Sequence, residues 1–197
     1  TGGVGLTGID TLSTTGNVTV TSSAYIKNIY TNGNVTLEGS ARADLISAKG
    51  WIYTKSGGTQ GDLYADKYIN ITNGSLKNAN TLSYIDWPSG GGTAQILTAG
   101  GYVNFGSSSV NTIRAKGNVN LSTWGTVSDV MSEGKIKCVS TNWGNYTLLK
   151  AISFESWPTK NATTLPAGTD SIVATGALVT VTAPNKPLVN ALSYESQ

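Results

Sequence analysis

Histidine is absent from this 197-residue chain, and cysteine occurs once. The lack of histidine removes the commonest general base and the commonest metal ligand. The single cysteine, Cys138, cannot form an intramolecular disulfide, and it stands at a repeat position that other copies fill with aliphatic residues. We therefore expect Cys138 to be a small buried residue, the alternative being a reactive or intermolecular thiol. No metal site and no cofactor is predicted.

Charge is also scarce, since Asp, Glu, Lys and Arg together make up 12% of the residues and balance to a net charge of +2. Binding to nucleic acid by counterion release needs a concentrated basic surface, so we expect no nucleic-acid partner. No apolar run approaches the roughly 18 residues of a membrane-spanning helix, and membrane insertion is not predicted.

What the sequence does contain is a repeat of 17 residues. Residues 16–32 begin Gly-Asn-Val-Thr-Val, residues 33–49 begin Gly-Asn-Val-Thr-Leu, and further copies start at Gly50 and Lys67. Each copy has apolar residues at the same places, with the alternation of a β-strand near its start. A period this short is typical of a solenoid whose coils stack on their neighbours.

Gly, Ser, Thr, Asn and Val dominate the chain, and these residues favour strands and tight turns. We expect an all-β, parallel β-helix, with glycines such as Gly33 at one corner in a positive-φ turn. Coils then pair at about 4.8 Å per rung, with Lys49 over Asp66 and Lys116 over Glu133. The predicted inner column contains Val18, Val35, Ile52 and Ile69. The predicted outer column contains Thr19, Thr36, Tyr53 and Asn70.

A longer repeat lies over the short one, because LSYIDWP at residues 82–88 returns as ISFESWP at residues 152–158. Its Trp-Pro pairs and glycines predict loop excursions, here called flaps, that interrupt the coils. We expect residues 1–150 to form the solenoid, with one flap at 82–100. Residues 151–197 are expected to hold a second flap and a C-terminal β segment that packs on the solenoid or continues it.

Aromatic residues in the flaps are the most specific candidates for contact with a partner or a glycan. They are Tyr84, Trp87, Phe154 and Trp157. Two interpretations remain open. The rings are exposed platforms for sugar rings or a partner surface, or they fold down as a lid that buries its large apolar area.

Catalysis is not predicted, because the acidic residues are scattered along the coils. Solenoid enzymes that cut acidic polysaccharides need clustered carboxylates with a nearby arginine or lysine. The closest pair outside the flaps, Asp62 and Asp66, has the spacing of a turn. No site residue with a catalytic role is therefore assigned.

The Gly-Asn-Val-Thr-Val repeat and its phase, over about residues 4–150, resemble the β-solenoids of bactofilins, the polymer-forming bacterial cytoskeletal proteins. They also resemble the solenoid regions attached to bacterial pilus-assembly and surface-adhesion proteins. Bactofilin coils usually run uninterrupted, so the predicted flaps favour the surface-protein branch. The resemblance implies a structural or adhesive role, extracellular or at the cell surface. The alternative is a carbohydrate-binding or polysaccharide-degrading solenoid of a phage tail or secreted enzyme.

The repeats are cut midway through a coil near Ile9 and midway through a third flap copy at residues 192–196. Uncovered strand edges and apolar columns are used by natural proteins for pairing. We therefore expect the chain to associate with itself, with other surface or pilus subunits, or with neighbouring sequence of a longer parent protein.

Overall fold

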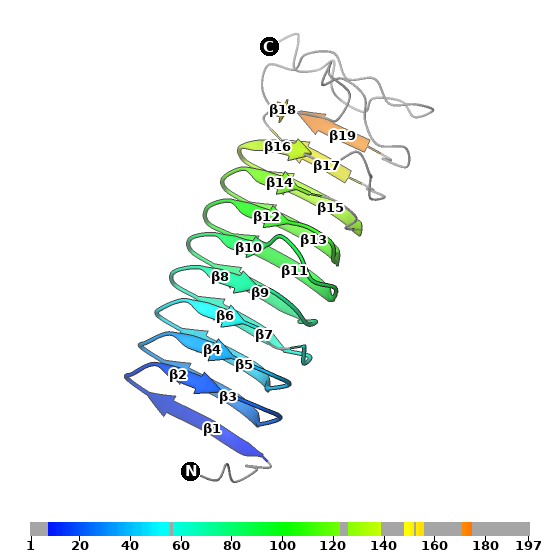
Figure 1. The fold of residues 1–197 in the computed structure, drawn as a ribbon. Helices are drawn as coiled ribbons and strands as arrows, with labels where there is room; N and C mark the ends of the chain where they lie inside the picture. The colour runs from blue at the N-terminus through cyan, green and yellow to red at the C-terminus, as the bar shows by residue number, and fades with distance from the viewer. Residues whose placement is uncertain are drawn as a thin grey trace.

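The computed structural model describes residues 8–55, 57–122, 126–138, 148–151, 153–155 and 171–174. These residues form a parallel β-solenoid in which successive coils stack in sequence order, from the blue β1 to the yellow β17 (Figure 1). Each complete coil contributes one strand to a long-stranded sheet and one to a short-stranded sheet. No helix occurs among the described residues.

The first sheet, here called the long sheet, takes the odd-numbered strands in order. They are β1 (Ile9–Thr14), β3 (Tyr25–Thr31), β5 (Arg42–Ala48), β7 (Asp62–Ala65), β9 (Asn78–Thr81), β11 (Thr93–Ala99), β13 (Ser109–Ala115), β15 (Thr126–Ser132), β17 (Leu148–Ala151) and β19 (Ser171–Ala174). The second, here called the short sheet, takes the even-numbered strands. They are β2 (Val18–Val20), β4 (Val35–Leu37), β6 (Ile52–Thr54), β8 (Ile69–Ile71), β10 (Ile85–Trp87), β12 (Val103–Phe105), β14 (Val119–Leu121), β16 (Lys135–Cys138) and β18 (Ser153–Glu155).

The 17-residue register is confirmed by the pairing of the first short strands. Val18 pairs with Val35, Val35 with Ile52 and Ile52 with Ile69. All four side chains are buried in one continuous core. Because side chains of a strand alternate between faces, the residues that follow them form the predicted outer column.

The predicted flap at residues 82–100 is not seen. These residues form an ordinary coil, with β10 in the short sheet and β11 in the long sheet. Ile85 pairs with both Ile69 and Val103, so one coil has 16 residues and the next has 18. The two departures from 17 cancel, and the register is restored at Val103.

The extra residue of the longer coil lies in a turn that makes room for Trp87. Gly92 in this turn has φ +150°, and a Cβ there would lie 2.0 Å from the Gly74 carbonyl oxygen and 3.2 Å from Trp87 Cζ2. Trp87 is 0% exposed. The Trp-Pro and glycine pattern that resembles a loop is therefore a turn adapted to a large core residue.

Residues of the second predicted flap are described in part. Strand β18 pairs with β16 in the short sheet, and β19 pairs with β17 in the long sheet. Phe154 lies in β18, in register with Ile136. Trp157 and residues 156–170 and 175–197 lie outside the described residues.

The corner glycines have a different role from the one expected. Gly33 is not among the positive-φ residues, but a Cβ on it would lie 2.6 Å from the Gly16 carbonyl carbon. Close stacking of rungs at this corner therefore excludes a side chain. The Thr31 hydroxyl joins the two rungs at this corner. Its Oγ1 donates to the Gly16 carbonyl and accepts from Gly33 N–H at 2.9 Å.

Ion pairs between neighbouring rungs occur, although at other places than those expected. Within the described residues they join Lys27 to Asp10 at 3.1 Å, Lys55 to Glu38 at 3.3 Å and Lys77 to Asp62 at 3.6 Å. The predicted partners Lys49 and Asp66, and likewise Lys116 and Glu133, form no salt bridge in this part of the structure.

Candidate functional site

Four aromatic side chains stack on one another along a corner of the short sheet, and we call them the aromatic ladder. They are Trp51, Tyr68, Tyr84 and Tyr102, each directly before a short strand. Ring centroids are 6.0, 4.9 and 4.7 Å apart in that order, and successive ring planes differ by 12°, 5° and 5°. The spacing follows from the rung separation of about 4.8 Å, which places flat rings in contact.

Asparagines take the same corner position on the rungs on either side of the ladder. Asn17 Oδ1 accepts from Asn34 N–H at 2.9 Å, and Asn34 Oδ1 accepts from Trp51 N–H at 3.0 Å. Asn118 Oδ1 accepts from Lys135 N–H at 2.9 Å. The corner is therefore joined from rung to rung either by side-chain hydrogen bonds or by stacked rings.

Two tyrosines of the ladder hold their protons more tightly than a free tyrosine. Burial raises the pKa of Tyr84, and repulsion from the ionised forms of Tyr102 and Tyr68 and from Asp86 adds to the effect. Burial also raises the pKa of Tyr102, with a smaller contribution from Asp86. The hydroxyls of Tyr84 and Tyr102 are therefore neutral hydrogen-bonding groups throughout the physiological pH range.

A row of amide and carboxylate side chains runs beside the ladder on the outer face of the short sheet. Asn104 Nδ2 donates to Asp86 Oδ1 at 3.1 Å, and Asn120 Nδ2 donates to Asn104 Oδ1 at 2.7 Å. Tyr84 thus lies half-buried between stacked rings and a polar row. This position is compatible with the contact role predicted for it.

Of the four predicted contact residues, only Tyr84 and Trp87 have described side chains, and these two do not lie on one surface. Tyr84 lies on the corner of the short sheet, whereas Trp87, three residues later, points into the core. The side chain of Phe154 and the whole of Trp157 are outside the description.

The long sheet carries a second candidate surface, which lies at the C-terminal ends of its strands. One outward residue of each strand pairs with its counterpart on the next rung. This outer row consists of Ser13, Tyr30, Ser47, Tyr64, Asn80, Thr98, Arg114, Met131 and Lys150. The residues two positions later in the sequence, at the corner that follows each strand, form a second row, here called the corner row. Those described are Thr15, Asn32, Lys49, Asp66, Leu82, Gly100, Lys116 and Glu133.

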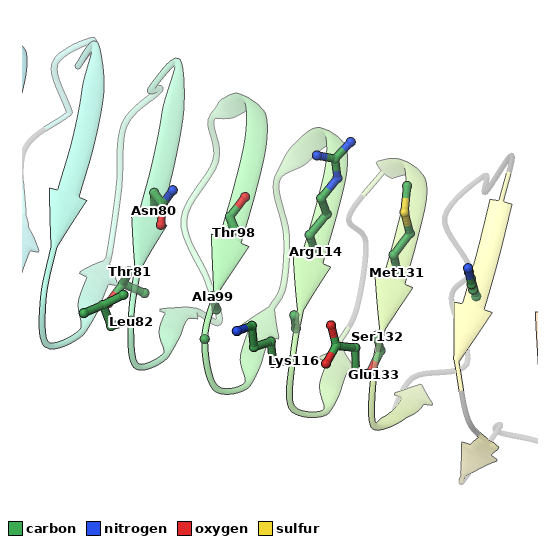
Figure 2. A pocket seen from close by; sticks show the side chains of 13 residues that line it. Asn80, Thr81, Leu82, Thr98, Ala99, Arg114, Lys116, Met131, Ser132 and Glu133 are labelled. Carbon is green, nitrogen blue, oxygen red and sulfur yellow. The ribbon is translucent and has the colours of Figure 1, made fainter. Parts of the chain in front are cut away.

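Between these two rows the surface is hollowed twice. The C-terminal hollow spans β9 to β17 and has a volume of about 440 Å³. Figure 2 shows Arg114 and Met131 on its outer row, with Lys116 and Glu133 on the corner row. The N-terminal hollow lies between the same rows around Tyr30 and Lys49, with about 410 Å³. Tyr64 stands on the outer row between the two hollows.

Sequence reasoning did not single out this surface, although it exposes large side chains. Leu82 is 73% exposed, Tyr64 45% and Tyr30 41%. The repeat could have predicted this surface, because Tyr30 and Tyr64 occupy the same repeat position two coils apart. That position is outward in every described coil.

No group of three or more His, Cys, Asp or Glu side chains that could hold a metal ion occurs among the described residues. Nor does the described part of the chain contain a helix long and apolar enough to cross a membrane. No family model matches the sequence, and no curated protein or solved structure matches it significantly.

Proposed function

We propose that this chain is a non-catalytic structural or adhesive element of a bacterial cell surface, acting outside the cell. It associates with its own kind in a filament or with other surface or pilus subunits. The observation that carries this proposal is the rung-to-rung register, which holds outward side chains in straight rows over many coils. A rigid surface with a constant repeat suits lateral or end-on contact better than it suits turnover of a small substrate.

The coil at residues 82–100 bears on the family resemblance. The coils run without interruption through these residues, as they usually do in the filament-forming bactofilins. The predicted flap was the reason to prefer a resemblance to surface proteins, and that reason no longer applies. Self-association is therefore a central part of the proposal.

A second candidate function is carbohydrate binding. It is favoured by the exposed Tyr30 and Tyr64 on the long sheet and by the half-buried Tyr84 of the ladder. Aromatic side chains combine an apolar ring with a polar tip, which suits contact with sugars. This candidate is compatible with an adhesive role and differs from the first in its ligand.

Two measurements test the proposal. Light scattering over a concentration series is expected to show association of the full chain, and a glycan panel with a turnover assay is expected to show no cleavage. Saccharide cleavage would exclude the non-catalytic role. A particle that stays monomeric at high concentration and binds neither glycan nor a surface subunit would contradict the structural and adhesive roles together.

A further inference from the structure

We infer that the two hollows of the long sheet form one binding track for an extended acidic polysaccharide, such as a polymer of uronic acids. The inference rests on the proposed adhesive function and names its ligand. Both hollows lie between the same two rows of side chains, so a ligand that follows the rows passes from one to the other. A linear polymer fits such a track better than a compact molecule does.

The charge of the C-terminal hollow favours an anionic ligand. Its lining contains the cations Arg114, Lys116 and Lys150 and one carboxylate, Glu133. All four are exposed. Arg114 lies on the outer row and Lys116 on the corner row (Figure 2). Lys150 follows Met131 on the outer row, so cations flank the hollow from both sides. Carboxylates of a polyuronate would form charge-assisted hydrogen bonds here, with Arg114 able to bind two oxygens at once.

The space for the polymer is set by small residues. Ala99 and Ala115 line the C-terminal hollow between the two rows, and Gly100 leaves the corner row without a side chain. Leu82 lines the β9 end of the hollow with an exposed apolar side chain, and Met131 supplies another apolar surface. These groups can cover the C–H faces of sugar rings while the cations bind the acidic groups.

Tyrosines continue the track toward the N-terminal end. Tyr64 and Tyr30 are exposed on the outer row and lie two rungs apart, a separation of about 10 Å. This separation is comparable with the length of two sugar rings in an extended chain. The serines that alternate with them, Ser13 and Ser47, and Lys49 on the corner row can donate hydrogen bonds to hydroxyl or carboxylate groups.

An acidic peptide is a less suitable occupant than a polysaccharide. Peptides that bind to sheets commonly add a strand to an open edge. From β3 to β17, however, every strand of the long sheet has a strand on both sides. A peptide lying in the hollows would therefore meet side chains alone and gain none of the main-chain hydrogen bonds of an added strand.

The first test measures binding of the full chain to polygalacturonate at low salt. We expect the triple variant Arg114→Gln, Lys116→Gln and Lys150→Gln to bind about tenfold more weakly, since exposed charges each contribute modestly. The control Arg42→Gln, Lys67→Gln and Lys137→Gln makes the same change in net charge outside both hollows and is expected to bind as the unmodified chain does. Equal weakening in both variants would show that only overall charge matters and would overturn the inference.

The second test separates the two hollows. Tyr30→Ala with Tyr64→Ala is expected to weaken binding of the long polymer severalfold and to leave a short oligogalacturonate, long enough for the C-terminal hollow alone, unaffected. Tyr53→Ala, on the short sheet, is the matched control and should change neither. An equal loss for the long and short ligands would contradict a continuous track.

Ligand class is tested with the same proteins. Fully methyl-esterified polygalacturonate, which is neutral, is expected to bind much more weakly than the acid form. Polyglutamate binding as tightly as polygalacturonate would overturn the choice of a polysaccharide. Cleavage of bound polygalacturonate would leave the track standing and exclude the non-catalytic function. Association of the chain without any polygalacturonate binding would overturn the track and leave the structural function standing.

Discussion

Trp87 packs edge-on against Phe105, with ring centroids 6.0 Å apart and ring planes at 90°. The two residues pair on adjacent rungs of the short sheet and are the two largest fully buried side chains described. Both occupy the third position of a short strand, where Val20 and Leu37 stand in the first coils. The core therefore holds larger side chains at these two rungs, and the neighbouring turn has glycine at position 92, where Trp87 approaches it.

Replacement of Trp87 by alanine is expected to lower the free energy of unfolding by about 3–5 kcal/mol, because a large buried ring is lost and a cavity remains. Trp87→Phe should cost less, since it keeps most of the ring and removes a buried Nε1–H that has no hydrogen-bond partner in the described structure. Urea denaturation measures both. Tyr64→Ala, at an exposed position, is the control and should lie within about 0.5 kcal/mol of the unmodified chain. A stable Trp87→Ala variant with impaired ligand binding would show that the ring acts on the surface.

Val35→Asp is expected to unfold the solenoid, because it places an unpaired charge in the continuous core column between Val18 and Ile52. The matched control is Thr36→Asp, which adds the same charge one residue later on the outward face. Circular dichroism during thermal melting distinguishes them. An unchanged melting temperature for Val35→Asp would contradict the 17-residue register.

Gln60 satisfies two backbone groups inside the solenoid. Its Oε1 accepts from Ala43 N–H at 2.9 Å, and its Nε2 donates to the Ala41 carbonyl at 2.8 Å. Gln60→Leu keeps a similar volume, removes both hydrogen bonds and takes the Gln60 acceptor away from the buried Ala43 N–H, so we expect it to lower the free energy of unfolding by about 1–3 kcal/mol. Gln95→Leu, at an exposed position of β11, is the control. Equal stability of the two variants would mean that water replaces the Gln60 amide.

The aromatic ladder is expected to make the protein sensitive to alkali. The pKa values of Tyr84 and Tyr102 are raised by folding. Their contribution to stability is therefore complete below the pKa of about 10 of an unfolded tyrosine and is lost as pH rises through the higher folded values. Absorbance of the phenolate and chemical denaturation, both followed from pH 9 upward, measure the effect.

The double variant Tyr84→Phe with Tyr102→Phe keeps the stacked rings and removes both titrating groups. We expect it to retain more of its stability above pH 10 than the unmodified chain does. Tyr64→Phe serves as a control outside the ladder and should not give this protection. If the double variant lost stability with pH as steeply as the unmodified chain, the ladder tyrosines would not be responsible.

The course of each coil could be predicted from the repeat alone. The repeated Gly-Asn-Val-Thr pattern, with apolar residues at alternate places, specifies which side chains face the core, because a shift of one residue would expose the whole inner column. Val18, Val35, Ile52 and Ile69 lie where this reasoning put them. Local alternation and a fixed period are properties of the chain alone, and they were sufficient for the fold class.

The places of the irregular segment and of the outward residues could be known only from the folded chain. Whether Trp87 lies in a loop or in the core depends on the room left by Gly92, where a Cβ would meet both the Trp87 ring and the Gly74 carbonyl of the preceding coil, and no local pattern records this contact. Tyr84 and Tyr102 are 18 residues apart in sequence and in contact only because an 18-residue coil separates them. The cations of the C-terminal hollow likewise come together only because stacking brings Lys150 of a later coil to the same side as Arg114 and Lys116, which share one coil. Such surfaces arise from distances between coils, and only the folded chain fixes those distances.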